Sequence, residues 1–130
     1  MDKSRIILKF VWQLLVLLLI IISLFPGSLS GLIIYGDLHM QNDLIKDHFG
    51  ISISHFLSFF LISIFGLCIY SKTNNYKKVL YALYFLSIIL ELLHFIVPRR
   101  SFQLSDLIAN ILGVLVAYFL VKIYLSFIRS

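Results

Sequence analysis

Four apolar runs, each about as long as a membrane-spanning helix, make up most of this chain of 130 residues. They cover residues 6–25, 51–70, 79–97 and 104–125. About 20 residues of helix, each rising about 1.5 Å, cross the hydrocarbon core of a bilayer, which is about 30 Å thick. In that core the backbone amides and carbonyls have no water to bind, so a spanning segment must be a helix. The runs therefore predict an all-α fold, a single domain of residues 1–130 with four transmembrane helices.

The composition supports a membrane environment and argues against a soluble domain. Hydrophobic residues make up 61% of the chain and charged residues only 13%. Soluble domains have about 25% charged residues, because a water-facing surface needs them. The net charge of +5 does not indicate nucleic-acid binding, since the basic residues lie singly or in small clusters between the apolar runs. We therefore expect the lipid bilayer as the surroundings and no nucleic-acid partner.

Proline and glycine mark the ends of two runs. Pro26 and Gly27 follow the first run and Pro98 follows the third, and neither residue type continues a helix well. The first run also resembles a secretory signal peptide, because it follows a charged start and precedes small residues. Its apolar stretch is longer than the roughly 7–15 residues of a signal core, so we expect it to remain as a transmembrane helix.

The distribution of basic residues predicts the orientation of the bundle, because cytoplasmic segments carry an excess of Lys and Arg. With both termini in the cytoplasm, three basic residues lie outside, namely Lys46, Arg99 and Arg100. Eight then lie inside: Lys3, Arg5, Lys9, Lys72, Lys77, Lys78, Lys122 and Arg129. This imbalance predicts N-in and C-in. It also assigns five of the six acidic residues to the outer half, where we look for a functional site.

The longest segment between two runs, residues 26–50, is predicted to be an outer loop. Its ionisable residues include Asp37, His39, Asp43, Asp47 and His48. A solvated loop over the membrane surface is the favoured interpretation, and a short interfacial helix or a metal site are the alternatives. The single cysteine, Cys68, lies in an apolar run and supports neither a disulfide within the chain nor a zinc–cysteine site. We expect no metal and no cofactor.

Ionisable side chains inside the predicted helices are costly, so they usually face a bundle interior, a cavity or a partner. Glu91 and His94 are three residues apart in the third run and share one helix face, with Tyr84 and Ser87 further in. Glu91 lies seven residues before Pro98, roughly 10 Å along the helix. This spacing predicts a position in the outer half of the bundle, below the membrane surface.

The fourth run has a polar face of the same kind. Positions i, i+4, i+7 and i+11 are Asp106, Asn110, Gly113 and Ala117, so the face is polar at its outer end and small further in. Small residues let helix backbones approach closely. Ser105 is predicted as the N-cap of this helix.

His55, near the start of the second run, completes a predicted polar cluster below Arg100 if the three polar faces meet. Several interpretations stay open. Glu91 and Arg100 pair to lock the bundle, or Arg100 binds the phosphate of an anionic lipid or lipid-linked precursor. Glu91 beside His94 can carry a proton, which makes these two the candidate catalytic residues. Glu91 and His94 also have the i, i+3 spacing of metal ligands in helix bundles, with His55 and Asp106 as further ligands, although we favour no metal here.

The ordered set of these motifs resembles the VanZ-like family. That family reads roughly E-x-x-Q, then P-x-R, then D-x-x-x-N-x-x-G, with a His at the start of the second helix. The matching residues lie within residues 50–120 and are His55, Glu91, His94, Pro98, Arg100, Asp106, Asn110 and Gly113. Two positions depart from the pattern. His94 stands where the family usually has Gln, and Ile51-Ser52 stands where it often has Asp-Lys.

The resemblance implies a multi-pass bacterial cell-membrane protein with four helices, in a family named after a protein associated with teicoplanin resistance. Our leading hypothesis is an envelope protein that recognises an anionic or lipid-linked component at the outer leaflet and so influences glycopeptide susceptibility. The predicted ligand-binding residues are His55, Glu91, His94, Arg100, Asp106 and Asn110. Two alternatives stay open: a membrane hydrolase or transferase acting on a lipid-linked phosphate, and a small assembly subunit that binds a membrane-protein partner.

Overall fold

The structure, a computed structural model, describes residues 3–27, 29–38 and 52–129, and these residues form helices and no strand. The helices are α1 (Lys3–Leu24), α2 (Leu29–Tyr35), α3 (Ile53–Tyr70), α4 (Tyr76–Leu93) and α5 (Leu104–Arg129). The predicted all-α fold is therefore confirmed for the part of the chain that is described.

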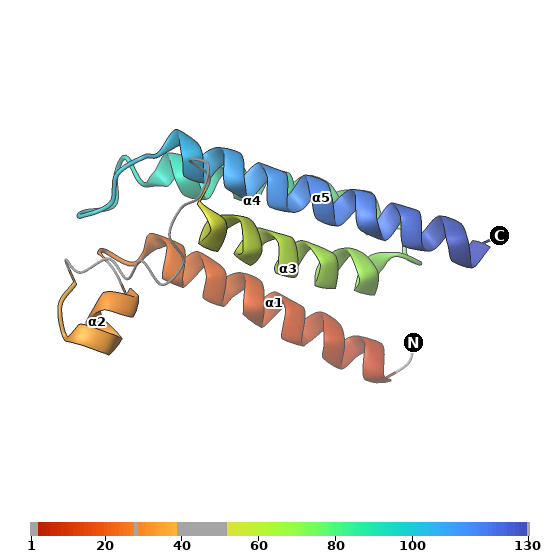
Figure 1. Cartoon of the computed structure of the whole chain (residues 1–130). Coiled ribbons are helices and arrows are strands. Elements are labelled where there is room, and N and C mark those ends of the chain that lie inside the picture. Colours follow the sequence, from red (N-terminus) through yellow and green to blue (C-terminus); the bar gives the residue numbers. More distant parts are fainter. Residues whose placement is uncertain (1–2, 28, 39–51, 130) are drawn as a thin grey trace.

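The four long helices lie side by side and alternate in direction, while the short α2 lies beyond the end of α1 (Figure 1). We call the end of the bundle with the α4–α5 connection the α4–α5 end. The opposite end, with the start of α1, the end of α5 and the α3–α4 turn, is the terminal end. α3 contacts each of the other three long helices, and its largest contact is with α5. The core of the molecule is therefore built around α3.

Two glycines allow the helices to approach α3 closely. A Cβ atom on Gly113 of α5 would lie 2.6 Å from the carbonyl oxygen of Phe56 and 2.9 Å from the amide nitrogen of Phe60, both on α3. A Cβ atom on Gly66 of α3 would lie 2.6 Å from the ring of Trp12, whose Nε1 donates to the carbonyl of Ile62 at 3.0 Å. Backbone-to-backbone packing of this kind is typical of helix pairs in membranes.

Large apolar side chains remain exposed along the helices, as expected where lipid takes the place of water. Trp12 is the only buried residue of α1, and most of the other apolar side chains of this helix lie on its outer surface. In water such a surface would be an extended hydrophobic patch, whereas in a bilayer it contacts acyl chains. The exposed apolar side chains therefore agree with the membrane environment that the composition predicts.

Three described helices are long and apolar enough to cross a membrane: α1, α3 and Leu104–Ile128 of α5. α4 has the same length as α3, 18 residues, but contains Lys77, Lys78 and Glu91. The expected fourth span therefore corresponds to a helix that has Lys77 and Lys78 in its first turn and Glu91 near its end, and it is not among the three candidate spans.

Several predicted boundaries differ from those in the structure. α4 ends at Leu93 rather than Val97, because the chain tightens into turns in which Phe95 donates to the Leu92 carbonyl at 3.2 Å. The prediction of Ser105 as an N-cap is wrong. The helix already begins at Leu104, and the carbonyl of Gln103 accepts the first helical hydrogen bonds.

The predicted outer loop of residues 26–50 contains the short helix α2, which is the alternative that the sequence had left open for part of this segment. Residues 39–51 lie outside the described residues. The predictions that concern His39, Asp43, Lys46, Asp47 and His48 therefore fall outside the part of the chain that the structure describes.

Candidate functional site

The structure brings five of the predicted site residues together at the α4–α5 end of the bundle. We call these residues the polar cluster: His55 on α3, Glu91 on α4, His94 directly after α4, and Asp106 and Asn110 on α5. Glu91, His94 and Asn110 have relative exposures of 0%, 2% and 1%. Three helices thus enclose a set of ionisable and amide groups inside an apolar bundle. Burial of such groups costs free energy, and in membrane proteins they usually belong to a functional site.

Glu91 and His94 form a buried pair one helical turn apart. His94 Nδ1 lies 3.2 Å from Glu91 Oε1, and the same carboxylate oxygen accepts the backbone amide of Gln103 at 2.9 Å. Gln103 directly precedes α5, so the carboxylate lies at the N-terminus of that helix, where the helix dipole favours negative charge. Glu91 therefore ties the end of α4 to the start of α5.

The partners of His94 fix where its protons lie. Its Nε2 is 3.0 Å from the carbonyl oxygen of Ser23, which can only accept, so Nε2 carries a proton. His94 Nδ1 faces Glu91 Oε1 at 3.2 Å, so the imidazole ring bridges the buried carboxylate of α4 and the Ser23 carbonyl of α1.

His55 is held in a similar way between Asn110 and Asp106. The Asn110 amide nitrogen donates to the carbonyl of Ser87 at 3.4 Å, which directs its oxygen towards His55 Nδ1 at 3.2 Å. His55 Nδ1 is therefore the protonated nitrogen, and its Nε2 faces Asp106 Oδ2 at 3.4 Å. His55 and Asp106 form the more accessible part of the polar cluster, since they keep side-chain exposures of 25% and 13%.

Arg100, the sixth predicted residue, lies in the turn before α5 and faces the end of α1. Its Nε donates to the carbonyl of Phe25 at 3.2 Å, and its Nη2 donates to that of Ile22 at 3.3 Å. Burial lowers the pKa of Arg100, while the nearby Glu91 and Asp106 carboxylates raise it. Because arginine titrates far above neutrality, the guanidinium stays charged beside the polar cluster.

Two partners of the polar cluster escaped the sequence analysis, namely Ser23 of α1 and Gln103 before α5. Both act mainly through main-chain atoms, the carbonyl of Ser23 and the amide of Gln103. Main-chain groups are present at every position, so no residue type signals their role. Ser23 is nevertheless informative, because its contact with His94 joins α1 to the site.

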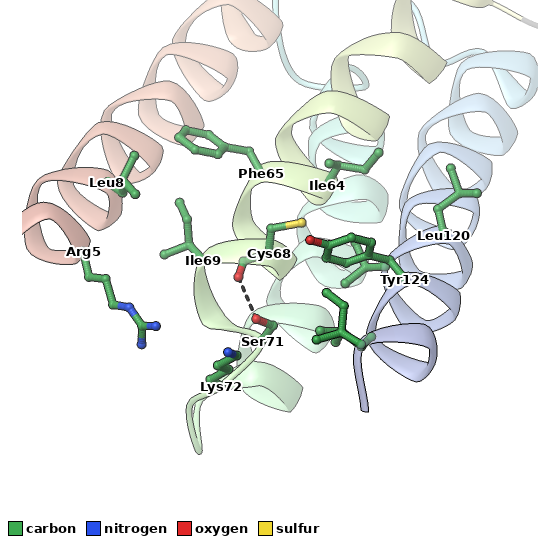
Figure 2. A pocket seen from close by; sticks show the side chains of 13 residues that line it. Arg5, Leu8, Ile64, Phe65, Cys68, Ile69, Ser71, Lys72, Leu120 and Tyr124 are labelled. Atoms are coloured by element: carbon green, nitrogen blue, oxygen red, sulfur yellow. Dashed lines mark hydrogen bonds between the residues drawn. The ribbon is translucent and has the colours of Figure 1, made fainter. Parts of the chain in front are cut away.

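A hollow lies elsewhere, at the terminal end of the bundle (Figure 2). It is an open groove of about 650 Å³ between α1, α3 and α5. Its walls are mainly apolar and include Phe65, Leu120 and Tyr124, with the basic side chains of Arg5 and Lys72 among them. None of the six predicted site residues lines this groove, so the polar cluster and the groove are separate features.

Taken together, the apolar helices and the buried polar cluster define a helical membrane protein with a polar site at one end of its bundle. The chain belongs to the VanZ/LLP1 family, whose model matches residues 10–125. This match includes α3, α4, most of α5 and all six predicted site residues, and it confirms the family indicated by the sequence motifs. No curated protein and no solved structure matches the chain.

Proposed function

We propose that this VanZ-family protein recognises an anionic or lipid-linked envelope component at the outer leaflet of the bacterial cell membrane. Through that recognition it would influence susceptibility to glycopeptides such as teicoplanin. The observation that carries the proposal is the buried polar cluster, whose Glu91 and Asp106 carboxylates are near enough to Arg100 to raise its pKa. Ionisable groups inside a membrane protein generally mark a ligand, ion or proton site, because their burial is costly.

The proposed topology has four spans with both termini in the cytoplasm. It is supported by the basic residues of the described helices, since Arg5, Lys9, Lys72 and Lys77 all belong to the terminal end. Lys77 and Lys78 occupy the first turn of α4, where long side chains can reach the interface. Glu91 is fully buried and does not face lipid, so its charge does not prevent α4 from spanning. In this orientation the polar cluster belongs to the outer leaflet.

Arg100 is the residue that we expect to contact a phosphate. A guanidinium has five N–H donors in a planar fork that matches phosphate oxygens, and the bonds to Phe25 and Ile22 use two of them. Those bonds also hold the guanidinium in a fixed position, so little side-chain freedom is lost on binding. The N-terminus of α5 lies close by and favours the same sign of ligand charge.

A second candidate function is an enzyme that acts on a lipid-linked phosphate. The observation in its favour is the buried contact between Glu91 and His94, because a carboxyl and an imidazole in contact can donate or accept a proton during bond cleavage. An enzyme would convert a bound lipid-linked phosphate into a product of different mass. A binding protein would release it unchanged.

Native mass spectrometry of the gently solubilised protein tests the binding proposal. Wild type is expected to retain an anionic phospholipid or polyprenyl phosphate adduct. Arg100→Ala should lose about tenfold to a hundredfold of the adduct, the effect of removing a charged hydrogen bond. Lys72→Ala removes a basic residue from the exposed surface of the terminal end and should keep the adduct. Circular dichroism of each variant would verify that it is folded.

Two results would contradict the proposal. Equal adduct in all three proteins would mean that the lipid binds away from Arg100. A membrane-protein partner retained in place of any lipid would instead indicate an assembly subunit, and the polar cluster would then be a structural device that holds the helices together.

A further inference from the structure

Three helices each contribute one potential metal ligand at the α4–α5 end. His55 of α3, Glu91 of α4 and Asp106 of α5 offer ligand atoms that all lie within 4.8 Å of one another. His55 Nε2 and Asp106 Oδ2 are 3.4 Å apart. This separation is already near the roughly 3.3 Å between ligands of a tetrahedral site with metal–ligand bonds of about 2.0–2.1 Å.

A second, independent observation concerns the carboxylate of Glu91. Its Oε2 is fully buried and has no hydrogen-bond partner among the described residues, whereas its Oε1 accepts the Gln103 amide and contacts His94 Nδ1. An unpartnered buried carboxylate oxygen is unfavourable, and most buried polar atoms in proteins are paired. A cation between Glu91, His55 and Asp106 would supply the interaction that this oxygen lacks.

Each of the three side chains is oriented by an outer partner, as metal ligands usually are. His55 donates from Nδ1 to Asn110 Oδ1, which leaves the lone pair of Nε2 available. Asp106 Oδ1 accepts the hydroxyl of Ser105 at 3.3 Å, which leaves Oδ2 facing His55. Glu91 Oε1 is held by the Gln103 amide and His94. These outer partners fix the tautomer of the His55 imidazole and the orientation of the Glu91 and Asp106 carboxylates.

His94 is not a ligand in this arrangement. Its Nε2 donates to the carbonyl of Ser23 and its Nδ1 contacts Glu91, so both ring nitrogens are occupied. The four-ligand set considered from the sequence is thereby reduced to three protein ligands. Three ligands with an open position are typical of zinc sites that also bind water or a substrate oxygen.

We propose that His55, Glu91 and Asp106 hold a divalent cation of the Zn²⁺ type. One imidazole and two carboxylates suit Zn²⁺, and its two positive charges balance the two carboxylates inside the bundle. The sequence alone had favoured no metal, because spacing along one helix cannot show that ligands from three helices meet.

A bound metal would also favour binding of a phosphate-containing ligand, and this consequence rests on the proposed function. Two carboxylates beside Arg100 would repel a phosphate, whereas a bound cation would attract one and could take a phosphate oxygen in its open position. The metal site itself stands on its own geometry and is tested with the metal alone.

The test uses the full chain in detergent micelles, stripped with a chelator and titrated with ZnCl₂ by calorimetry, with bound zinc measured by elemental analysis. A Cys68→Ser background removes the only thiol, which could bind zinc independently. We expect about one Zn²⁺ per chain, and at least about tenfold weaker binding for Asp106→Asn and Glu91→Gln. His48→Ala removes a histidine of the 26–50 segment and should leave the affinity unchanged.

Folding of the variants is checked by circular dichroism, and Asp106→Asn is the more secure variant because Asp106 is partly exposed and Asn has the same shape. Zn²⁺ should also raise the thermal unfolding temperature of the background protein but not that of Asp106→Asn. Substoichiometric zinc in the background protein, or zinc bound equally well by Asp106→Asn, would overturn the proposal. Neither result depends on any lipid, so failure of the metal site and failure of the proposed function are separable.

Discussion

Replacing His94 with leucine is expected to destabilise the folded bundle by about 3–5 kcal/mol, the range for removing one partner of a buried ion pair. The substitution leaves Glu91 fully buried with the Gln103 amide as its main-chain partner, and it removes the donor to the Ser23 carbonyl. A lost hydrogen bond between membrane helices costs on average only about 0.6 kcal/mol. The size of the effect therefore distinguishes a buried carboxylate left without its side-chain partner from the loss of a single ordinary hydrogen bond.

His94→Gln is the matched control for this prediction. An amide can donate to Glu91 and contact Ser23, and it is the residue that the family usually has at this position, so we expect a loss below about 1 kcal/mol. Unfolding in mixed micelles can be followed by the fluorescence of Trp12, the only tryptophan of the chain. A His94→Leu protein as stable as His94→Gln would show that a polar partner for Glu91 and Ser23 at this position does not stabilise the bundle.

Substitution of Gly113 by alanine is expected to lower the stability by about 1–3 kcal/mol, the usual effect of overpacking. The new methyl group would lie 2.6 Å from the Phe56 carbonyl oxygen, a main-chain atom that cannot rotate away. α3 and α5 would have to separate, although alanine is the better helix former by about 1 kcal/mol. This helix pair also carries the contact between His55 and Asn110, so the polar cluster would be disturbed with it.

Ser126→Thr is the control for Gly113→Ala. It adds one methyl group to the same helix at an exposed position and should change the stability by less than about 0.5 kcal/mol. Both variants are compared with wild type in the same micelle titration. If Gly113→Ala proved as stable as wild type, the close approach of α3 and α5 would not be a requirement of the fold.

The long helices could be predicted because apolar run length and helical periodicity are local properties of a sequence. The faces of α4 and α5 followed from the spacing of Glu91, His94, Asp106 and Asn110. In the structure Asp106 and Asn110 contact His55, and Glu91 contacts His94. What escaped prediction depends on tertiary contacts. The carbonyl of Ser23 and the amide of Gln103 have no side-chain signature, and only the packed helices show that they satisfy His94 and Glu91.

The interpretation of Arg100 also changed in detail with the structure. Sequence position indicated a charged residue above the polar cluster, available for a phosphate or for Glu91. The structure adds that the guanidinium donates to the carbonyl oxygens of Ile22 and Phe25 at the end of α1. One side chain therefore links α1 to the α4–α5 turn while its charge remains beside Glu91 and Asp106.

The location of the bound lipid is the most direct test of the central claim that the polar cluster is the ligand site. A polyprenyl phosphate with a photoreactive group near its phosphate would be crosslinked to the reconstituted protein, and the modified peptides identified by mass spectrometry. We predict modification at the α4–α5 end, within residues 94–106 or at the start of α3. Modification confined to the groove at the terminal end, near Arg5, Lys72 or Tyr124, would contradict the claim.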